Sequence, residues 1–220
     1  MQSWMLEAPQ VKLPHTALTA FEVAWTTRDL SLLPSGMPRW LFLRWLEGQG
    51  VLFHGSPHDG LSELRPLLKE YNQPDEFSNR TGVYAASDGL WAMMYALRGP
   101  AATGMMDMGL RLRVGQDWSP MRYFMSLATD TPVGSNGRDL LGTGTVYVLS
   151  RDGFEPSAPY QHPGLGEVHE MHCVSPQRVR PLMAVAVTPQ DFPLLVRVHD
   201  AARVRALAAV HPWGFPWLGT

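Results

Sequence analysis

The sequence predicts an α+β protein that folds as a single domain. Strand-like segments rich in β-branched and aromatic residues recur along the 220 residues, and helical patterns are scattered among them without regular strand–helix alternation. Twenty glycines and nineteen prolines favour short elements and many loops. Hydrophobic residues form 45% of the chain, which is enough apolar material for a sizeable core.

The first part of the chain, residues 1–50, is expected to form an N-terminal helical extension packed on the core. A short helix is predicted between Pro38 and Gly48, because apolar residues recur there at helical spacing. Residues 51–54 then form an apolar run that reads as a strand and enters a tight turn at Gly55.

A second strand, over residues 82–86, is expected to lead directly into a helix. Asp88 is placed to cap that helix, and apolar residues over 89–98 supply its buried face. Gly99 and Pro100 then end it.

The second half of the chain holds the remaining expected elements. Strand-like segments separated by turn residues lie at 110–114, 145–149, 168–174 and 179–187. Within a final unit over 191–220, Asp200 is placed to cap a helix over 201–210. The methionines at 105, 106 and 108 are expected to fill core space, and Trp213 and Trp217 to pin the tail.

Charge and cysteine content exclude several classes of protein. The formal net charge is -2 without a cluster of Lys and Arg, so a broad nucleic-acid or membrane-binding footprint is not expected. Cys173 is the only cysteine, which rules out an intramolecular disulfide. With no long apolar segment, the expectation is a cytoplasmic protein without a membrane partner.

The residues that suggest chemistry form an ordered series. His54-Gly55-Ser56 ends a strand, Tyr84 lies on the next strand, Tyr95 follows after ten intervening residues, and Glu170 lies on a late strand. In this order and spacing the sequence resembles the ADP-ribosyltransferase superfamily, particularly its diphtheria-toxin and poly(ADP-ribose) polymerase branch. Residues 144–148 also look like the central strand of the rifampin-modifying members.

The resemblance covers roughly residues 51–187 and implies a fold. It is a split antiparallel β-sheet core with peripheral helices, here a catalytic domain over 51–190. Residues of about 100–142 look like an insertion in this comparison. The resemblance places this insertion and the loop before Glu170, including Tyr160, His162 and Glu167, where family members recognise their acceptor.

The resemblance also implies that NAD is the co-substrate and that no metal is needed. Gly55 would let the backbone approach the nicotinamide carboxamide, His54 would bind the adenosine ribose, and Ser56 would contact the nicotinamide ribose or carboxamide. Tyr84 and Tyr95 would hold the nicotinamide ring by stacking, although either could also be a half-buried core aromatic.

Glu170 is the expected catalytic carboxylate, acting with His54 and Tyr84. Cleavage of the nicotinamide bond develops positive charge on the ribose, which a nearby carboxylate stabilises. Glu167 is its competitor, but its spacing of three residues from Glu170 does not match arginine-specific members, whose two carboxylates lie two apart. The implied activity is mono-ADP-ribosyl transfer to an acceptor that is a protein, a nucleic acid or a small molecule.

Three alternatives stay open at this point. An NAD glycohydrolase would use the same residues, and an inactive module would bind an NAD-like ligand or a partner without turnover. A metal-dependent hydrolase is suggested by His169, Glu170, His172 and Cys173. On a continuous strand, however, Glu170 and His172 share one face and the other two share the opposite face, so the four do not converge.

Overall fold

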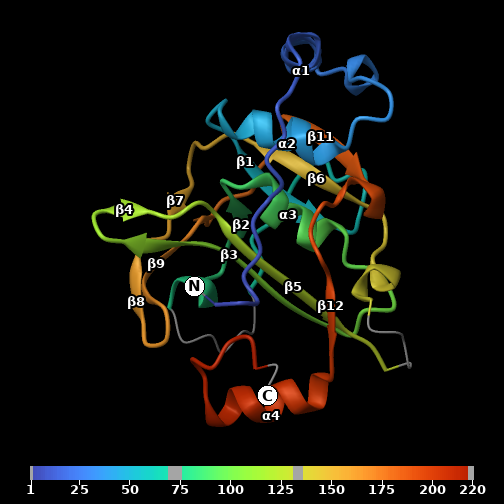
Figure 1. The fold of residues 1–220 in the computed structure, drawn as a ribbon. Helices are drawn as coiled ribbons and strands as arrows, with labels where there is room; N and C mark the ends of the chain where they lie inside the picture. Colours follow the sequence, from blue (N-terminus) through green and yellow to red (C-terminus); the bar gives the residue numbers. More distant parts are fainter. Residues whose placement is uncertain (1, 69–75, 131–135, 218–220) are drawn as a thin grey trace.

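Two β-sheets enclose a central helix in this protein (Figure 1). The computed structural model describes residues 2–68, 76–130 and 136–217. Within these ranges the chain forms four α-helices and twelve strands, and every strand pair is antiparallel except β12 with β5. The α+β class predicted from the sequence is therefore confirmed.

The first sheet has the strand order β11–β6–β1–β2–β10–β7. Its strands are β1 (Leu52–Ser56), β2 (Val83–Ala86), β6 (Gly144–Leu149), β7 (Glu155–Pro156), β10 (His172–Ser175) and β11 (Met183–Val187). Successive residues alternate between two cores: Phe53 and Val148 pack into the main core, whereas Leu52 and Leu149 pack into a smaller one on the other face. The strands predicted over 51–54, 82–86 and 145–149 are confirmed.

The second sheet has the order β12–β5–β3–β9–β8, with β4 paired to β3. Its strands are β3 (Gly104–Val114), β4 (Asp117–Trp118), β5 (Arg122–Ala128), β8 (Tyr160–His162), β9 (Gly166–Glu170) and β12 (Arg197–His199). All seven residues of β5 are buried. Residues 100–142, expected as an insertion, therefore supply the central strands β3 and β5 of this sheet, apart from 131–135, which lie outside the described residues.

The physical reason for this difference is that β3 and β5 bury side chains on both faces. Met106 and Met108 of β3 pack with Phe124 of β5 on the outer face of the sheet, as core filling predicts. Tyr123 and Met125 face the opposite way, into the main core. A segment that fills two cores cannot be a peripheral addition.

The single strand predicted over 168–174 is wrong, because the chain changes sheets at Met171. β9 pairs with β3 up to Glu170, and β10 pairs with β2 from His172 onward. The carbonyl of Met171 accepts the Ser87 N–H at 2.8 Å, and its own N–H donates to the carbonyl of Gly109 at 3.5 Å. Met171 therefore joins the two sheets through its backbone.

The helices are short and distributed around the sheets. They are α1 (His15–Thr27), α2 (Arg39–Glu47), α3 (Gly89–Ala96) and α4 (Ala201–Val210), with 3-10 turns η1 (Leu30–Leu32), η2 (Phe77–Asn79), η3 (Gly137–Leu140) and η4 (Pro189–Asp191). The helices predicted after Pro38, Asp88 and Asp200 are confirmed, and both aspartates accept the expected capping N–H. Among the described residues, none of these helices has the length and apolar character needed to cross a membrane.

The two ends of the chain meet on the outer face of the second sheet. Trp4 packs edge-to-face against Phe124 and Phe215, and Trp217 packs against Phe215. Trp213 contacts Tyr160 and His162 of β8. These contacts confirm that the C-terminal tryptophans hold the tail on the domain.

Two carboxyl groups, the buried Asp88 and the half-buried Glu47, lie where α2 meets the start of α3. Asp88 accepts hydrogen bonds from the Trp91 N–H at 2.8 Å and the Tyr123 hydroxyl at 2.6 Å, and Glu47 accepts the Gly89 N–H at 3.0 Å. Burial, reinforced by the charge of Asp88, raises the pKa of Glu47 to about 8, and burial likewise raises the pKa of Asp88. Glu47 is therefore mainly protonated near neutral pH.

Replacing Glu47 by Gln is expected to remove part of the pH dependence of stability. The folded-state pKa of Glu47, about 8, exceeds its unfolded value of 4.5. The folded state therefore loses stability as the pH rises from 4.5 to about 8. Gln keeps an acceptor for the Gly89 N–H but cannot ionise. Thermal melts should show Glu47→Gln gaining roughly 5 °C more over wild type at pH 8 than at pH 5.

The exposed Glu22 of α1 supplies the matched control, since Glu22→Gln should follow the wild-type pH dependence. Equal pH dependence of Glu47→Gln and wild type would contradict the assignment of Glu47 as the titrating group.

Candidate functional site

The candidate site begins where β1 and β2 separate. The two strands pair at Phe53 and Ala86 but not beyond, and the His54 ring turns toward the second strand. Its Nδ1 lies 2.7 Å from the carbonyl oxygen of Tyr84. A carbonyl oxygen can only accept, so Nδ1 carries the hydrogen and the neutral ring is the Nδ1–H tautomer.

Tyr84 is fixed from the other side by the segment around η2. Its hydroxyl lies 2.7 Å from the carbonyl oxygen of Phe77 and 2.8 Å from that of Arg80. Its ring meets the Phe77 ring edge-on, with centroids 6.3 Å apart. The ring of Tyr84 is therefore held in place by contacts at both its hydroxyl and its edge.

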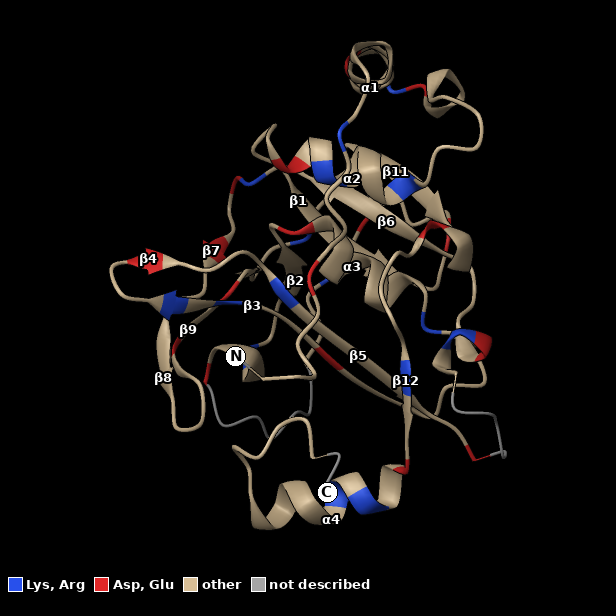
Figure 2. Ribbon diagram, in the orientation of Figure 1, with Lys and Arg blue, Asp and Glu red and all other residues tan. Residues whose placement is uncertain are grey.

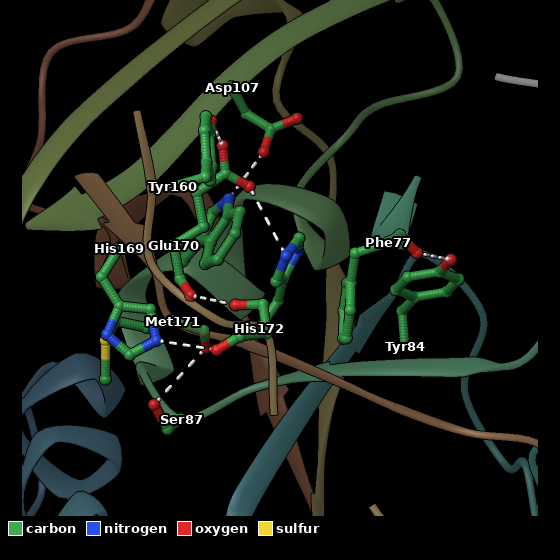
Figure 3. A network of polar contacts seen from close by, with 11 residues as sticks. Phe77, Tyr84, Ser87, Asp107, Tyr160, His169, Glu170, Met171 and His172 are labelled. Atoms are coloured by element: carbon green, nitrogen blue, oxygen red, sulfur yellow. Dashed lines mark hydrogen bonds and ion pairs between the residues drawn. The ribbon is translucent and has the colours of Figure 1, made fainter. Parts of the chain in front are cut away.

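Glu170 reaches this region from the second sheet (Figure 3). Its Oε1 accepts the Tyr160 hydroxyl at 2.9 Å, and its Oε2 lies 3.7 Å from Nε2 of His172. The His172 ring in turn lies 6.5 Å from the Tyr84 ring, centroid to centroid. His54, Tyr84 and Glu170 are thus brought to one region, with His172 between the tyrosine and the carboxylate.

His172 is enclosed by two parallel aromatic rings. Phe77 stacks on it at 4.7 Å with an interplanar angle of 27°, and Trp91 stacks at 5.5 Å with an angle of 26°. The Trp91 indole N–H donates to Asp107 at 2.6 Å. A side chain at Gly109 would collide with the Trp91 ring at 2.5 Å, so this glycine makes room for the indole.

Gly55 lies against α3, a packing role that the sequence did not predict. A Cβ at this position would lie 1.8 Å from the carbonyl oxygen of Ala92 and 2.8 Å from the amide nitrogen of Ala96. Close packing between β1 and α3 therefore requires glycine here, whatever the backbone of this residue binds.

Ser56 and Tyr95 make contacts that support the fold. The buried Ser56 hydroxyl oxygen accepts the N–H of His58 at 3.1 Å, which shapes the turn after β1. Tyr95 lies one helical turn after Trp91 on α3 and packs, partly buried, against the main core. The ring of Tyr84 contacts those of Phe77 and His172.

The proposed metal ligands do not converge. The His169 Nε2 lies 3.0 Å from the carbonyl oxygen of Ser157, while Cys173 is buried in the smaller core. Burial also raises the pKa of the Cys173 thiol, which disfavours the thiolate that metals bind. Among the described residues, no three His, Cys, Asp or Glu side chains form a group that could hold a metal ion.

Several side chains around Glu170 were not assigned to a site from the sequence. They are Phe77, Trp91 and Asp107. Tyr160 was expected only in the loop that recognises the acceptor, and His172 was considered only as a metal ligand. Trp91 precedes Tyr95 by one helical turn, a spacing that places both on adjacent parts of one helix face. That spacing was the available signal for Trp91, whereas the contacts of Tyr160 depend on the pairing of β8 with β9.

The site lies in a molecule whose charges are dispersed. Acidic and basic residues are interspersed along the ribbon, and α3 and β6 carry none (Figure 2). Glu167, the alternative catalytic carboxylate, lies on β9 within 3.8 Å of Arg113, with both side chains more than a third exposed. Glu170 is less exposed, with 23% of its side chain accessible, and lies at the boundary between the sheets.

Replacing Gly55 by Ala is expected to destabilise the protein by about 1–3 kcal/mol, because the new methyl group collides with helix backbone that cannot yield locally. Urea unfolding should show this as a lower midpoint with an unchanged slope. Gly104→Ala is the matched control, since its Cβ would make a 3.4 Å contact with the Ala128 side chain. Wild-type stability of Gly55→Ala would show that α3 does not pack this closely on β1.

The chain matches no protein-family model, and comparison with curated proteins and with solved structures likewise finds no match. The site is therefore interpreted from its own geometry.

Proposed function

We propose that this protein cleaves the bond between nicotinamide and ribose in NAD and transfers ADP-ribose to an acceptor. The observation that carries the proposal is the position of Glu170, which reaches from the second sheet to His172 of the first sheet, beside Tyr84. The resemblance of these residues to the ADP-ribosyltransferase superfamily supports the same reading.

Cleavage of the nicotinamide–ribose bond requires a carboxylate that is held in place beside the ribose. When the C1′–N bond breaks, its electron pair leaves with nicotinamide and positive charge develops on the sugar, as in other glycosyl transfers. Glu170 would stabilise that charge and bind a ribose hydroxyl. The acceptor then forms the new bond to C1′ and gives its proton to a base.

The remaining residues would bind and orient the dinucleotide. The fixed ring of Tyr84 offers an aromatic surface for the flat nicotinamide ring, with Tyr95 contributing from α3. His54, whose Nδ1–H is directed at the Tyr84 carbonyl, would accept a hydrogen bond from an adenosine ribose hydroxyl at Nε2 when neutral. Gly55 and Ser56 would contribute through their backbone at the end of β1.

Glu170→Gln should lower the rate of nicotinamide release from NAD by roughly 100-fold or more, because the amide is nearly isosteric but carries no charge for the transition state. Tyr84→Ala should abolish nicotinamide release, because it removes the aromatic ring that would stack on nicotinamide. The measurement is nicotinamide release by purified protein, with and without cell lysate. Stimulation by lysate indicates transfer to an acceptor, and equal rates indicate hydrolysis by water.

Glu167→Gln is the matched control, a substitution of the same kind three residues away on β9, and it should retain most of the wild-type rate. Melting temperatures of all variants exclude unfolding as the cause of a loss. A wild-type rate in Glu170→Gln would refute the assigned role. If wild type releases no nicotinamide but NAD raises its melting temperature, the protein is instead a module that binds NAD without turnover.

A further inference from the structure

The two carboxylate oxygens of Glu170 have different partners. Oε1 accepts the hydroxyl of Tyr160 on β8 at 2.9 Å, whereas Oε2 faces Nε2 of His172 on β10 at an ion-pair distance of 3.7 Å. One partner comes from each sheet. Because each oxygen has its own partner, rotation of the carboxylate about the Cγ–Cδ bond disturbs both contacts.

The imidazole that faces Oε2 is itself held in orientation. Phe77 and Trp91 stack on its two faces, so the ring plane is fixed and Nε2 is directed along the plane toward Glu170. Trp91 is locked by its hydrogen bond to Asp107 and by contact with Gly109. A carboxylate beside an imidazole attracts the ring when it is protonated.

Among the described residues, charged and titratable groups near His172 lie on β9, β2, β8 and β3 and at Arg80. Glu170 of β9 contacts it directly, and Tyr84 of β2 lies beside its ring. Three further groups touch the partners of His172. Tyr160 of β8 is hydrogen-bonded to Glu170, and Asp107 of β3 is hydrogen-bonded to Trp91. The guanidinium of Arg80 lies over the Phe77 ring. Of the groups whose contacts with His172 are described, the nearest charge is thus a carboxylate.

We propose that His172 is a positioning residue for the proposed reaction: held between Phe77 and Trp91, it works with Tyr160 to orient the Glu170 carboxylate toward the ribose. This inference rests on the proposed cleavage of NAD. Glu170 and His172 lie on either side of Met171, where the chain passes from the second sheet to the first. The backbone of Met171 is hydrogen-bonded to both sheets. His172 thereby ties the orientation of a second-sheet carboxylate to the first sheet, on which Tyr84 lies.

Two substitutions separate positioning from simple filling of space. His172→Phe keeps a flat ring between Phe77 and Trp91 but has no donor, whereas His172→Gln keeps an N–H donor and has no ring. We expect kcat for nicotinamide release to fall about 10- to 100-fold in His172→Phe, with KM for NAD changed less than about 2-fold, because a misdirected carboxylate affects mainly the transition state. His172→Gln should retain more activity than His172→Phe.

The pH profile gives a second readout. When His172 is protonated it favours ionised Glu170, so the acidic limb of the wild-type rate profile should lie lower than in His172→Phe, by roughly one pH unit. His199→Phe, at another half-buried histidine outside the site on β12, should leave both the rate and this limb unchanged.

A measurement without NAD tests the pairing itself. Histidine titration by NMR should show the midpoint of His172 falling by roughly half a unit or more in Glu170→Gln, since the pair is reciprocal, while His199 stays unchanged. An unchanged His172 midpoint overturns the inference. So does an active wild type in which His172→Phe exceeds His172→Gln in kcat, because that order is expected of a residue that only fills space.

The two proposals fail in distinguishable ways. If NMR shows the pair but wild type releases no nicotinamide, the proposed function fails and with it the catalytic meaning of the pair. If wild type is active and the substitutions leave kcat and the acidic limb unchanged, the role of His172 fails while NAD cleavage stands. Should His172→Phe not fold, the comparison of His172→Gln with Tyr160→Phe tests the same two contacts.

Discussion

The closeness of α3 to its neighbours is the constraint on which the rest of this structure depends. Cβ atoms at Gly55 and Gly144 would lie 1.8 and 1.9 Å from carbonyl oxygens of the helix, so α3 packs backbone to backbone on β1 and β6. At its start, Gly89 lies against Leu43 of α2 with the same lack of space. Glycine at these positions lets a short apolar helix lie between two sheets without a layer of side chains on that side.

The position of α3 then determines the candidate site. Trp91 projects from the helix over Gly109 of β3 and reaches Asp107, so the helix is tied to the second sheet as closely as to the first. The same indole forms one wall around His172. A shift of α3 would therefore move Trp91, and with it the imidazole that faces Glu170. Packing and chemistry are connected through a single side chain.

Local signals in the sequence were sufficient for most elements but not for their assembly. Asp88 before an apolar run predicts a helix start, and the alternating run at 145–149 predicts a strand, since both depend on neighbouring residues only. The turn of the chain at Met171 leaves no such mark, because residues on both sides have strand-like character. Its cause is pairing with Gly109 and Ser87, which are distant in sequence.

The same distinction applies to the site residues. His54, Tyr84 and Glu170 could be selected because their order and spacing form a pattern, and the structure places them in one region. The contacts of Tyr160 and His172 with Glu170 could not be predicted, since they form only when β8 lies beside β9 and β10 beside β2. Gly55 shows the opposite case: its place in a ligand-like motif coincides with a packing requirement that alone accounts for glycine.

The carboxyl groups near α3 show why Glu170 is the one suited to chemistry. Asp88 is buried and both its oxygens accept hydrogen bonds, from the Trp91 N–H and the Tyr123 hydroxyl, so it has no route to a ligand. Glu47 lies close enough to Asp88 that their charges oppose each other, and its pKa of about 8 keeps it largely neutral. Glu170 instead faces a hydroxyl and an imidazole at the boundary of the sheets. The hydrogen bond to one oxygen and the imidazole 3.7 Å from the other hold this carboxylate in place, as stabilisation of a developing cation on a sugar requires.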